Sequence, residues 1–394
     1  MDTMDELHNI MNSWSFWDGE IPASIPRNVE LPKELRDKIC LVIQGVRRCG
    51  KSTLLQQLIR RYTLDPKNCA FVNFEDPRLI QHLTYQTLES VREKFRSIRP
   101  GVSRLFFFLD EIQVVKGWRQ WLRTRLERPS GDIFVVTGSN SELLSGELSS
   151  SLTGRHLTVE LFPFDFEELR SFRPEMGILE YLESGGFPEP LMTGDNEWLL
   201  RQYFNDIVEK DIRERLHARS SLPIRQVVQM VFESAGAEMS IRRVAAACGI
   251  AVDTASAYLN AGEQAYLLHS CPFFAFSERR RSSRNRKYYP ADTGLRRAVV
   301  SRSGADRGKS LECAVYLALR RRFGRVFYWR GKGEVDFVVH DREDGRIIPF
   351  QVTWNEPSER HYEAMDDFYE NFPHAQETVW VNADSFERNM GKFL

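Results

Sequence analysis

The sequence predicts an α/β fold: a parallel sheet with helices on both faces, followed by a winged helix and a C-terminal α+β domain. Three observations favour this prediction. Short apolar runs alternate with amphipathic helical segments up to about residue 162, which is the pattern of parallel sheets. A glycine-containing turn joins the first apolar run to the first helix. Beyond about residue 236, short helices and strands follow one another without that alternation.

Each element is expected from its own pattern of apolar residues. A helix over 51–62 carries four apolar residues at helical spacing, Leu54, Leu55, Leu58 and Ile59. The expected strands of the first sheet are short apolar runs, at 40–44, 69–74, 105–109 and 133–137. The last part should hold a helix over 311–322 and strands over 326–328, 335–340 and 347–352. The expected domains are a lead-in (1–36), an α/β core (37–162), a helical lid or linker (163–235), a winged helix-turn-helix (236–277) and a C-terminal domain (278–394).

Composition excludes several classes of protein. The formal net charge of the 394 residues is -1, so any nucleic-acid surface must be a local patch. The six cysteines form no Cys-x-x-Cys pair and no disulfide framework, which argues against a zinc site and for a reducing compartment. Apolar runs such as 105–112 are too short to span a bilayer. We therefore expect a cytoplasmic protein without a membrane partner.

The run from Gly45 to Ser52 has the spacing Gly-x-x-x-x-Gly-Lys-Ser between a strand and a helix, which is the context of a phosphate-binding P-loop. Gly45 and Gly50 allow the tight turn that points backbone N–H groups at phosphates. Lys51 should reach the β- and γ-phosphates, and the hydroxyl of Ser52 should bind magnesium. The residues expected to contact ATP are Gly45, Arg48, Cys49, Gly50, Lys51, Ser52 and Thr53.

An acid pair ends the apolar strand over 105–109. Asp110 should hold magnesium, directly or through water. Glu111 should orient and activate the attacking water as a general base. Together with the P-loop, this pair predicts a magnesium-dependent ATP hydrolase.

Two further polar positions are candidates for the same site. The strand over 133–137 runs into Gly-Ser-Asn-Ser, where Ser139, or else Asn140, could sense the γ-phosphate; the alternative is an ordinary turn. Arg155, at the end of Leu-Thr-Gly-Arg, could stabilise charge on the transferred phosphoryl group, or be a plain surface arginine.

Residues 238–270 have the pattern of a helix-turn-helix with a wing. Ser240 is expected to cap the first helix and Gly249 to end it. The second helix offers a single candidate for reading bases, Asn260, so the unit is either a DNA reader or a packing module. The basic run 279–287 could neutralise phosphates of duplex DNA; the alternative is an ordinary solvated surface. Its cationic residues are Arg279, Arg280, Arg281, Arg284, Arg286 and Lys287.

Taken together, these motifs resemble one family, the prokaryotic AAA+-type ATPases with a C-terminal domain of the DUF4143 type. The resemblance covers about residues 30 to 355. Besides the P-loop, it rests on the segments 109–113, 137–141, 152–155, 162–169, 185–188, 287–295, 308–312 and 333–337. It implies an AAA+ core with a helical lid, a winged helix and a module similar to PD-(D/E)XK nucleases. It also implies assembly into a ring, in which Arg155 would act across a subunit interface.

The nuclease pattern is only partly present. The resemblance implies a magnesium site at Asp336, Glu312 and position 351. However, position 351 is Gln351, a weak ligand for a hard cation, and Thr353 stands where a water-activating lysine belongs. Lys332 is a speculative substitute. We therefore expect a nuclease-like fold used for binding rather than for cleavage.

Three hypotheses follow. The first is an ATPase motor or switch whose cycle controls C-terminal modules that engage duplex DNA. The second is a magnesium-dependent nuclease gated by ATP. The third is an interaction scaffold in which ATP sets the oligomeric state and the C-terminal half binds a protein.

Overall fold

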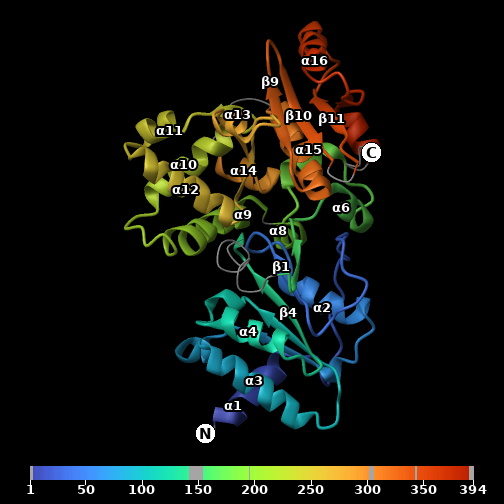
Figure 1. Cartoon of the computed structure of the whole chain (residues 1–394), viewed down its shortest axis with the longest axis vertical. Helices are drawn as coiled ribbons and strands as arrows, with labels where there is room; N and C mark the ends of the chain where they lie inside the picture. Colours follow the sequence, from blue (N-terminus) through green and yellow to red (C-terminus); the bar gives the residue numbers. More distant parts are fainter. Residues whose placement is uncertain (1–2, 142–153, 195, 301–305, 342–343, 390–394) are drawn as a thin grey trace. The chain divides into compact units, whose positions relative to one another are not determined.

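The computed structural model describes residues 3–141, 154–194, 196–300, 306–341 and 344–389. Its contacts divide the chain into two compact units, Met1–Leu161 and Phe162–Leu394. Each unit is described by itself below. Their elements are labelled in Figure 1.

The first unit is built on a five-stranded parallel sheet. Its strands are β1 (Cys40–Gln44), β2 (Cys69–Asn73), β3 (Leu105–Asp110), β4 (Asp132–Gly138) and β5 (His156–Glu160), in the order β2-β3-β4-β1-β5. The four strands expected from sequence are confirmed, each within a residue or so. The edge strand β5 was not expected, because its partly exposed residues form no continuous apolar run.

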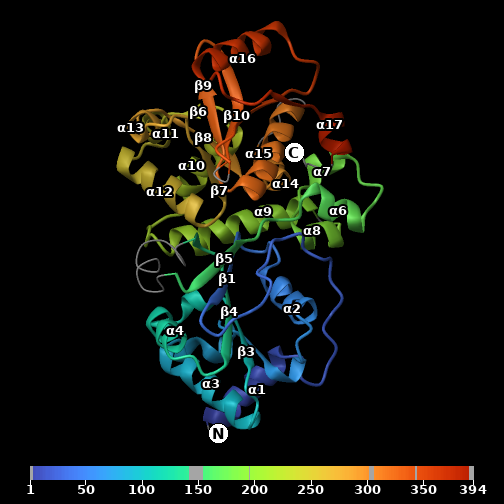
Figure 2. The ribbon, with the colours of Figure 1, turned by 45° about the vertical axis from the view of Figure 1, so that its right-hand side comes forward.

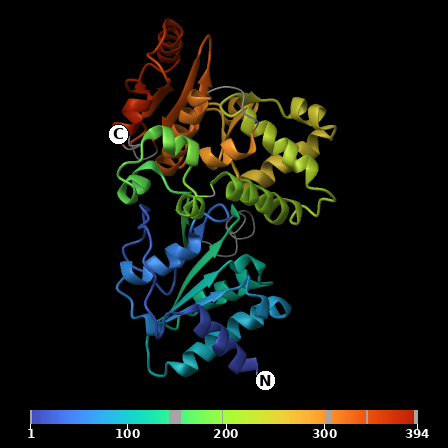
Figure 3. The same ribbon diagram turned by 180° about the vertical axis from the view of Figure 1, so that it is seen from behind.

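Helices cover both faces of this sheet, as the strand–helix alternation predicts. Helices α1 (Thr3–Trp14), α3 (Tyr85–Ile98) and α4 (Trp118–Glu127) cover one face, and α2 (Lys51–Arg61) covers the other, as Figures 1 and 3 show. The core on the first face includes buried residues of α1, such as Met11. The N-terminal segment is therefore part of this unit's core.

The second unit begins with a helical stretch. It contains α6 (Phe166–Phe172), α7 (Ile178–Ser184), α8 (Pro188–Thr193), α9 (Asn196–Asp206) and α10 (Leu222–Glu233), with a π-helical segment, η5 (Ile207–Arg213), after α9. The mostly helical character expected for 163–235 is confirmed.

The region expected to be a winged helix contains α11 (Ile241–Cys248) and α12 (Val252–Gln264), bent by 107° about a left-handed Gly249. Ser240 lies at the N-cap position of α11, but its side chain makes no capping hydrogen bond there, so the expected cap is wrong in that respect. The strand β7 (Leu268–Cys271) lies at the end of the region expected to carry the wing. It pairs with β8 (Arg286–Pro290), which also pairs with β6 (Glu238–Met239).

The C-terminal part is a four-stranded mixed sheet, seen edge-on with α15 beside it in Figure 2. Its order is β12-β11-β10-β9, with β12 parallel to β11 and the other pairs antiparallel. Its strands are β9 (Phe327–Arg330), β10 (Glu334–His340), β11 (Ile347–Val352) and β12 (Val379–Val381). The helices of this part are α13 (Glu278–Ser282), α14 (Thr293–Val299), α15 (Arg307–Phe323), α16 (Glu359–Asn371) and α17 (Ala383–Arg388).

In the described residues, no single helix has the length and apolar character needed to cross a membrane. The bent pair α11 and α12 meets both criteria only when the two helices are taken together.

Candidate nucleotide-binding site

The loop between β1 and α2 requires glycine at both of its ends. A Cβ atom on Gly45 would lie 2.0 Å from the carbonyl oxygen of Leu161, closer than real contacts allow. Gly50 has φ 99°, a left-handed conformation that favours glycine, and α2 starts at the next residue. Gly50 is also the N-cap residue of α2 and has no side chain to accept a hydrogen bond from the first N–H groups of the helix. This loop therefore has the form of an anion-binding site.

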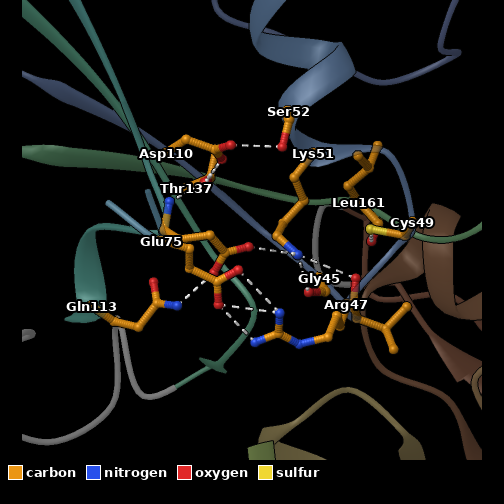
Figure 4. Close-up of polar contacts among 12 residues, drawn as sticks. Gly45, Arg47, Cys49, Lys51, Ser52, Glu75, Asp110, Gln113, Thr137 and Leu161 are labelled. Carbon is orange, nitrogen blue, oxygen red and sulfur yellow. Dashed lines mark hydrogen bonds and ion pairs between the residues drawn. The ribbon is translucent and has the colours of Figure 1, made fainter. Parts of the chain in front are cut away.

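Lys51 lies almost fully buried beneath this loop, at 4% exposure. Its Nζ donates to the carbonyl oxygens of Gly45 and Val46, each at 3.2 Å, and lies 3.6 Å from Oε1 of Glu111 (Figure 4). The lysine thus folds back onto its own loop. Backbone carbonyls are modest partners for an ammonium group, so a phosphate could displace them.

Ser52 and Asp110 come together from α2 and the end of β3. Oγ of Ser52 donates to Oδ2 of Asp110 at 2.7 Å, as Figure 4 shows. Asn73 donates to the same carboxylate oxygen at 3.4 Å. A hydroxyl and a carboxylate side by side are hard oxygen ligands of the kind that magnesium prefers, so these two residues fit the ion expected with ATP.

Thr137, at the end of β4, was not among the residues expected at the site. Its hydroxyl donates to Oδ1 of Asp110 and accepts the backbone N–H of Glu111 at 2.9 Å. It is fully buried. Thr137 therefore fixes both residues of the acid pair, a role that a threonine inside an apolar strand does not reveal in the sequence.

Glu111 has a strained backbone, with φ 54° in the left-handed region that non-glycine residues rarely adopt. Its Oε2 accepts a hydrogen bond from Nε2 of Gln113 at 2.5 Å. Burial opposes ionisation of this carboxyl, but the charge of Lys51 and the bond from Gln113 outweigh it, so the pKa of Glu111 is lowered. The side chain is thus held as a carboxylate in a fixed direction.

The neighbouring carboxyl behaves in the opposite way. Burial, and then the charge of Glu111, raise the pKa of Asp110. Two adjacent carboxyls whose pKa values are pushed apart are typical of sites where one acts as a base and the other binds a cation. Positive charge next to Ser52 and Asp110 would favour ionised Asp110.

Residues 37–170 match the family model of an AAA domain. An uncharacterized protein of Methanocaldococcus jannaschii is 32% identical, over 87% of this chain and 81% of that protein. An uncharacterized protein of Haemophilus influenzae is 29% identical, over 81% of this chain and 84% of that protein. The chain belongs to this family of AAA-domain proteins.

Residues 177–306 of this AAA-domain protein match a domain of unknown function (DUF8612), which is not the DUF4143 type that the resemblance implied. Among solved structures, Cdc6p from Pyrobaculum aerophilum is similar with a TM-score of 0.28 and 11% identity, over 68% of this chain and 86% of that one. AMPPCP-bound DnaA from Aquifex aeolicus is similar with a TM-score of 0.27 and 15% identity, over 57% and 81% of the two chains. Similarity at this level carries no argument about function.

The other residues expected near the AAA-domain site lie as follows. Ser139 is buried just after β4, and Asn140 is half-buried next to it. Arg155 precedes β5, and its Nη1 lies 3.8 Å from Oε1 of Glu127 at the end of α4, which is not part of the P-loop. Leu152 and Thr153 of the same motif lie outside the described residues.

The side chains of Cys49, Arg27 and Arg47 make further contacts around the P-loop. Sγ of Cys49 donates to the carbonyl of Leu161 at 3.3 Å, and burial raises the pKa of this thiol, so it is a neutral packing group. The buried Arg27, from the N-terminal connector, donates to the carbonyl of Cys49 at 2.8 Å. Arg47 forms an ion pair of 3.1 Å with Glu75 after β2. Charged residues in irregular segments gave no sequence signal for these contacts.

The C-terminal residues expected to bind metal lie on β10, β11 and α15. Nε2 of Gln351 donates to Oδ2 of Asp336 at 2.8 Å, and Oε1 of Glu312 accepts from Tyr289 at 2.7 Å. Over the described ranges, no group of three or more His, Cys, Asp or Glu residues is arranged to hold a metal ion. The predicted metal site at Glu312, Asp336 and Gln351 therefore has no support in this geometry. Lys332 is exposed at the turn before β10.

Only some of the cationic side chains in the basic run 279–287 are exposed to solvent. Arg279, Arg280, Arg284 and Arg286 are exposed, whereas Lys287 is fully buried. The prediction that Lys287 contacts phosphates is therefore wrong, because its position in β8 turns its side chain into the interior. The guanidinium groups of Arg280 and Arg284 lie over the ring of Phe273, at 5.9 and 5.1 Å from its centroid.

Proposed function

We propose that this AAA-domain protein is a magnesium-dependent ATPase whose hydrolysis cycle controls how its C-terminal half engages duplex DNA. The observation that supports the ATPase part is the meeting of four side chains at the carboxyl ends of β1 and β3. Lys51 and Ser52 come from the P-loop helix, and Asp110 and Glu111 from the end of β3. Ligands of open parallel sheets bind at such strand ends.

Phosphate binding follows from the shape of the loop. The uncapped first turn of α2 offers N–H groups and the positive end of the helix dipole to the anion. Lys51 exchanges its two carbonyl contacts for phosphate oxygens, which are stronger acceptors. Magnesium, when bound next to Ser52 and Asp110, supplies positive charge to the phosphate oxygens.

Water activation is assigned to Glu111. Its carboxylate accepts a hydrogen bond from Gln113, and its Oε1 lies 3.6 Å from Nζ of Lys51. Thr137 holds its backbone, and the left-handed φ directs its side chain into the site. This arrangement lets Glu111 accept a proton from water that attacks the γ-phosphate.

Glu111→Gln tests this assignment, because it keeps the size of the side chain and removes its basicity. We expect ATP affinity within a few-fold of wild type and steady-state turnover lower by about 10²- to 10³-fold. Glu93→Gln, an exposed position on α3, is the matched control and should keep wild-type turnover. Undiminished hydrolysis in Glu111→Gln would show that the base lies elsewhere.

The DNA part of the proposal is supported by four exposed arginines, Arg279, Arg280, Arg284 and Arg286, in and after α13. Two of them stack on Phe273, so their side chains are partly ordered before any partner binds. Arginines ordered in this way can neutralise phosphates at little entropic cost.

The matched experiment replaces Arg279, Arg280 and Arg284 by alanine and measures duplex DNA binding against salt concentration. Each lost phosphate contact should make the plot of the logarithm of the DNA-binding constant against the logarithm of salt concentration shallower by about 0.9. The slope of the triple variant should therefore be shallower than that of wild type by about 2 to 3. The control changes three exposed cations of the first unit, Lys67, Arg123 and Arg128, to alanine. If wild type shows no salt-sensitive DNA binding, the alternative of an ATP-controlled protein scaffold takes its place.

Two other expectations remain part of the proposal. Assembly into a ring, with Arg155 acting on a neighbouring subunit, is supported by the 43% exposure of that side chain. Light scattering of the Glu111→Gln protein with ATP tests it. The second candidate, an ATP-gated nuclease, would use Asp336 on β10 and Gln351 on β11, but in the described residues no three metal-ligating side chains gather there. Plasmid nicking that disappears in Asp336→Ala would favour it.

A further inference from the structure

A buried lysine lies among three carboxylates in the second unit. Lys287 is on β8, Glu312 on α15, and Glu334 and Asp336 on β10, elements that Figure 2 shows close together. The side chain of Lys287 is 0% exposed, and its Nζ forms an ion pair with Oε1 of Glu334 at 2.5 Å. It also lies 5.2 Å from the centroid of the Tyr328 ring. A lysine this buried requires neighbouring negative charge, which these carboxylates supply.

The other two carboxylates are bound by donors from the chain. The hydroxyl of Tyr289 donates to Glu312 at 2.7 Å. Oδ2 of Asp336 accepts both the side-chain amide of Gln351 and the backbone N–H of Val352, each at 2.8 Å. The acidic groups are thus satisfied by one ammonium group, one hydroxyl and two N–H groups, and Nη1 of the half-exposed Arg330 lies 3.7 Å from Oε2 of Glu334. All of these donors belong to the chain.

A divalent cation does not fit among these groups. Magnesium needs several hard oxygen ligands, but Gln351 directs its NH₂ group, not its carbonyl, at Asp336. An ammonium group already lies beside Glu334 and would repel a metal placed next to it. The described residues offer no set of three metal-ligating side chains here or elsewhere. The nuclease resemblance and the residues present therefore disagree.

We propose that Lys287 is the resident cation of this cluster, and that its ammonium group takes the electrostatic role that the nuclease resemblance assigns to magnesium. The C-terminal half then works without a metal. This inference rests on unit 2 alone and does not depend on ATP hydrolysis by the first unit. It excludes metal-dependent cleavage at Asp336 and makes the cluster a fixed structural joint between β8, β10 and α15.

The first experiment measures thermal unfolding of the full-length protein, without nucleotide, as manganese chloride is added. Wild type and Asp336→Asn should respond alike, within about 1 °C, because no cation enters the cluster. Asp336→Asn alone should unfold at the wild-type temperature or above, since it removes a negative charge from an acidic group. A wild-type increase of several degrees with manganese, absent in Asp336→Asn, would overturn the proposal.

The second experiment tests the lysine directly. Lys287→Met keeps the length of the side chain and leaves the carboxylates without their cation, so unfolding should occur at least about 6 °C lower. Adding Glu334→Gln to Lys287→Met should restore about half of the loss, because it removes the carboxylate that lost its buried ammonium partner. A Lys287→Met protein as stable as wild type, or a double variant no better than the single one, would contradict the resident-cation role. If Lys287→Met does not fold, the manganese comparison decides.

Discussion

The two units each contain a buried lysine among carboxylates, yet the two lysines are held in different ways. Lys51 and Lys287 have side-chain exposures of 4% and 0%. Lys51 lies 3.6 Å from Glu111 and donates to two backbone carbonyls of its own loop. Lys287 makes a direct ion pair with Glu334, on a different element.

The contacts of Lys51 can be replaced by those of a ligand, whereas the contacts of Lys287 are fixed within the fold. The contacts of Lys51 lie next to an uncapped helix N-terminus, so an entering anion gains both the lysine and the helix. The carboxylates around Lys287 are already satisfied by chain donors, so a ligand would gain little and would break existing bonds. The same residue types can thus serve catalysis or structure, depending on which contacts are replaceable.

The largest expected effect concerns Lys51. Lys51→Ala should lower steady-state ATP turnover by more than about 10²-fold, because the lysine neutralises phosphate charge. Its unfolding temperature without nucleotide should change by only a few degrees, in contrast to Lys287→Met. Lys67→Ala, at an exposed position, is the control. If Lys51→Ala loses as much stability as Lys287→Met, the proposed difference between the two buried lysines is wrong.

Next in size is Thr137→Val, which keeps the shape of the side chain and removes its hydroxyl. Asp110 loses a donor and the N–H of Glu111 loses its acceptor inside the core, which should cost about 1–3 kcal/mol in the free energy of unfolding. Turnover should fall about 10-fold, because the acid pair is less well held. Urea unfolding and steady-state hydrolysis measure the two effects. Thr137→Ser, which keeps the hydroxyl, should recover most of the activity.

A smaller effect is expected at Arg27. Arg27→Met removes the hydrogen bond to the carbonyl of Cys49 but keeps the buried length of the side chain. The P-loop should be held less firmly, so KM for ATP should increase about 5-fold while kcat changes less than 2-fold. An equal fall in kcat would instead place Arg27 in the chemical step.

The last prediction concerns the acid stability of the second unit. Burial, and then Arg320 and Arg321, lower the pKa of His269 to about 3. Because this is below the unfolded value, neutral His269 contributes fully above pH 6.5, and its contribution is lost as pH falls from 6.5 towards 3. Unfolding monitored at pH 7 and pH 5 should show wild type losing about 2 kcal/mol more than His269→Leu. Equal losses would mean that His269 titrates normally.

The sequence predicted the strands of the first sheet and the P-loop well, because apolar runs and a fixed spacing carry those signals. It did not predict β5, an edge strand with only one buried residue, or the role of Thr137, since threonine is common in strands. Lys287 was misassigned because it ends a run of arginines. Lys287 lies in β8 and pairs with Cys271 of β7, and this pairing decides that its side chain is buried. The register of strand pairing is a property of the folded sheet.

The close approach of Leu161 to the P-loop has a mechanical consequence. Its carbonyl oxygen contacts Cys49 and excludes a side chain at Gly45, and its N–H donates to Gln44 at 2.7 Å. Leu161 is also the last residue of the first unit, so the polypeptide leaves that unit from the wall of the nucleotide loop. A shift of the loop on ATP binding or phosphate release would therefore move Leu161, the residue from which the chain continues to Phe162.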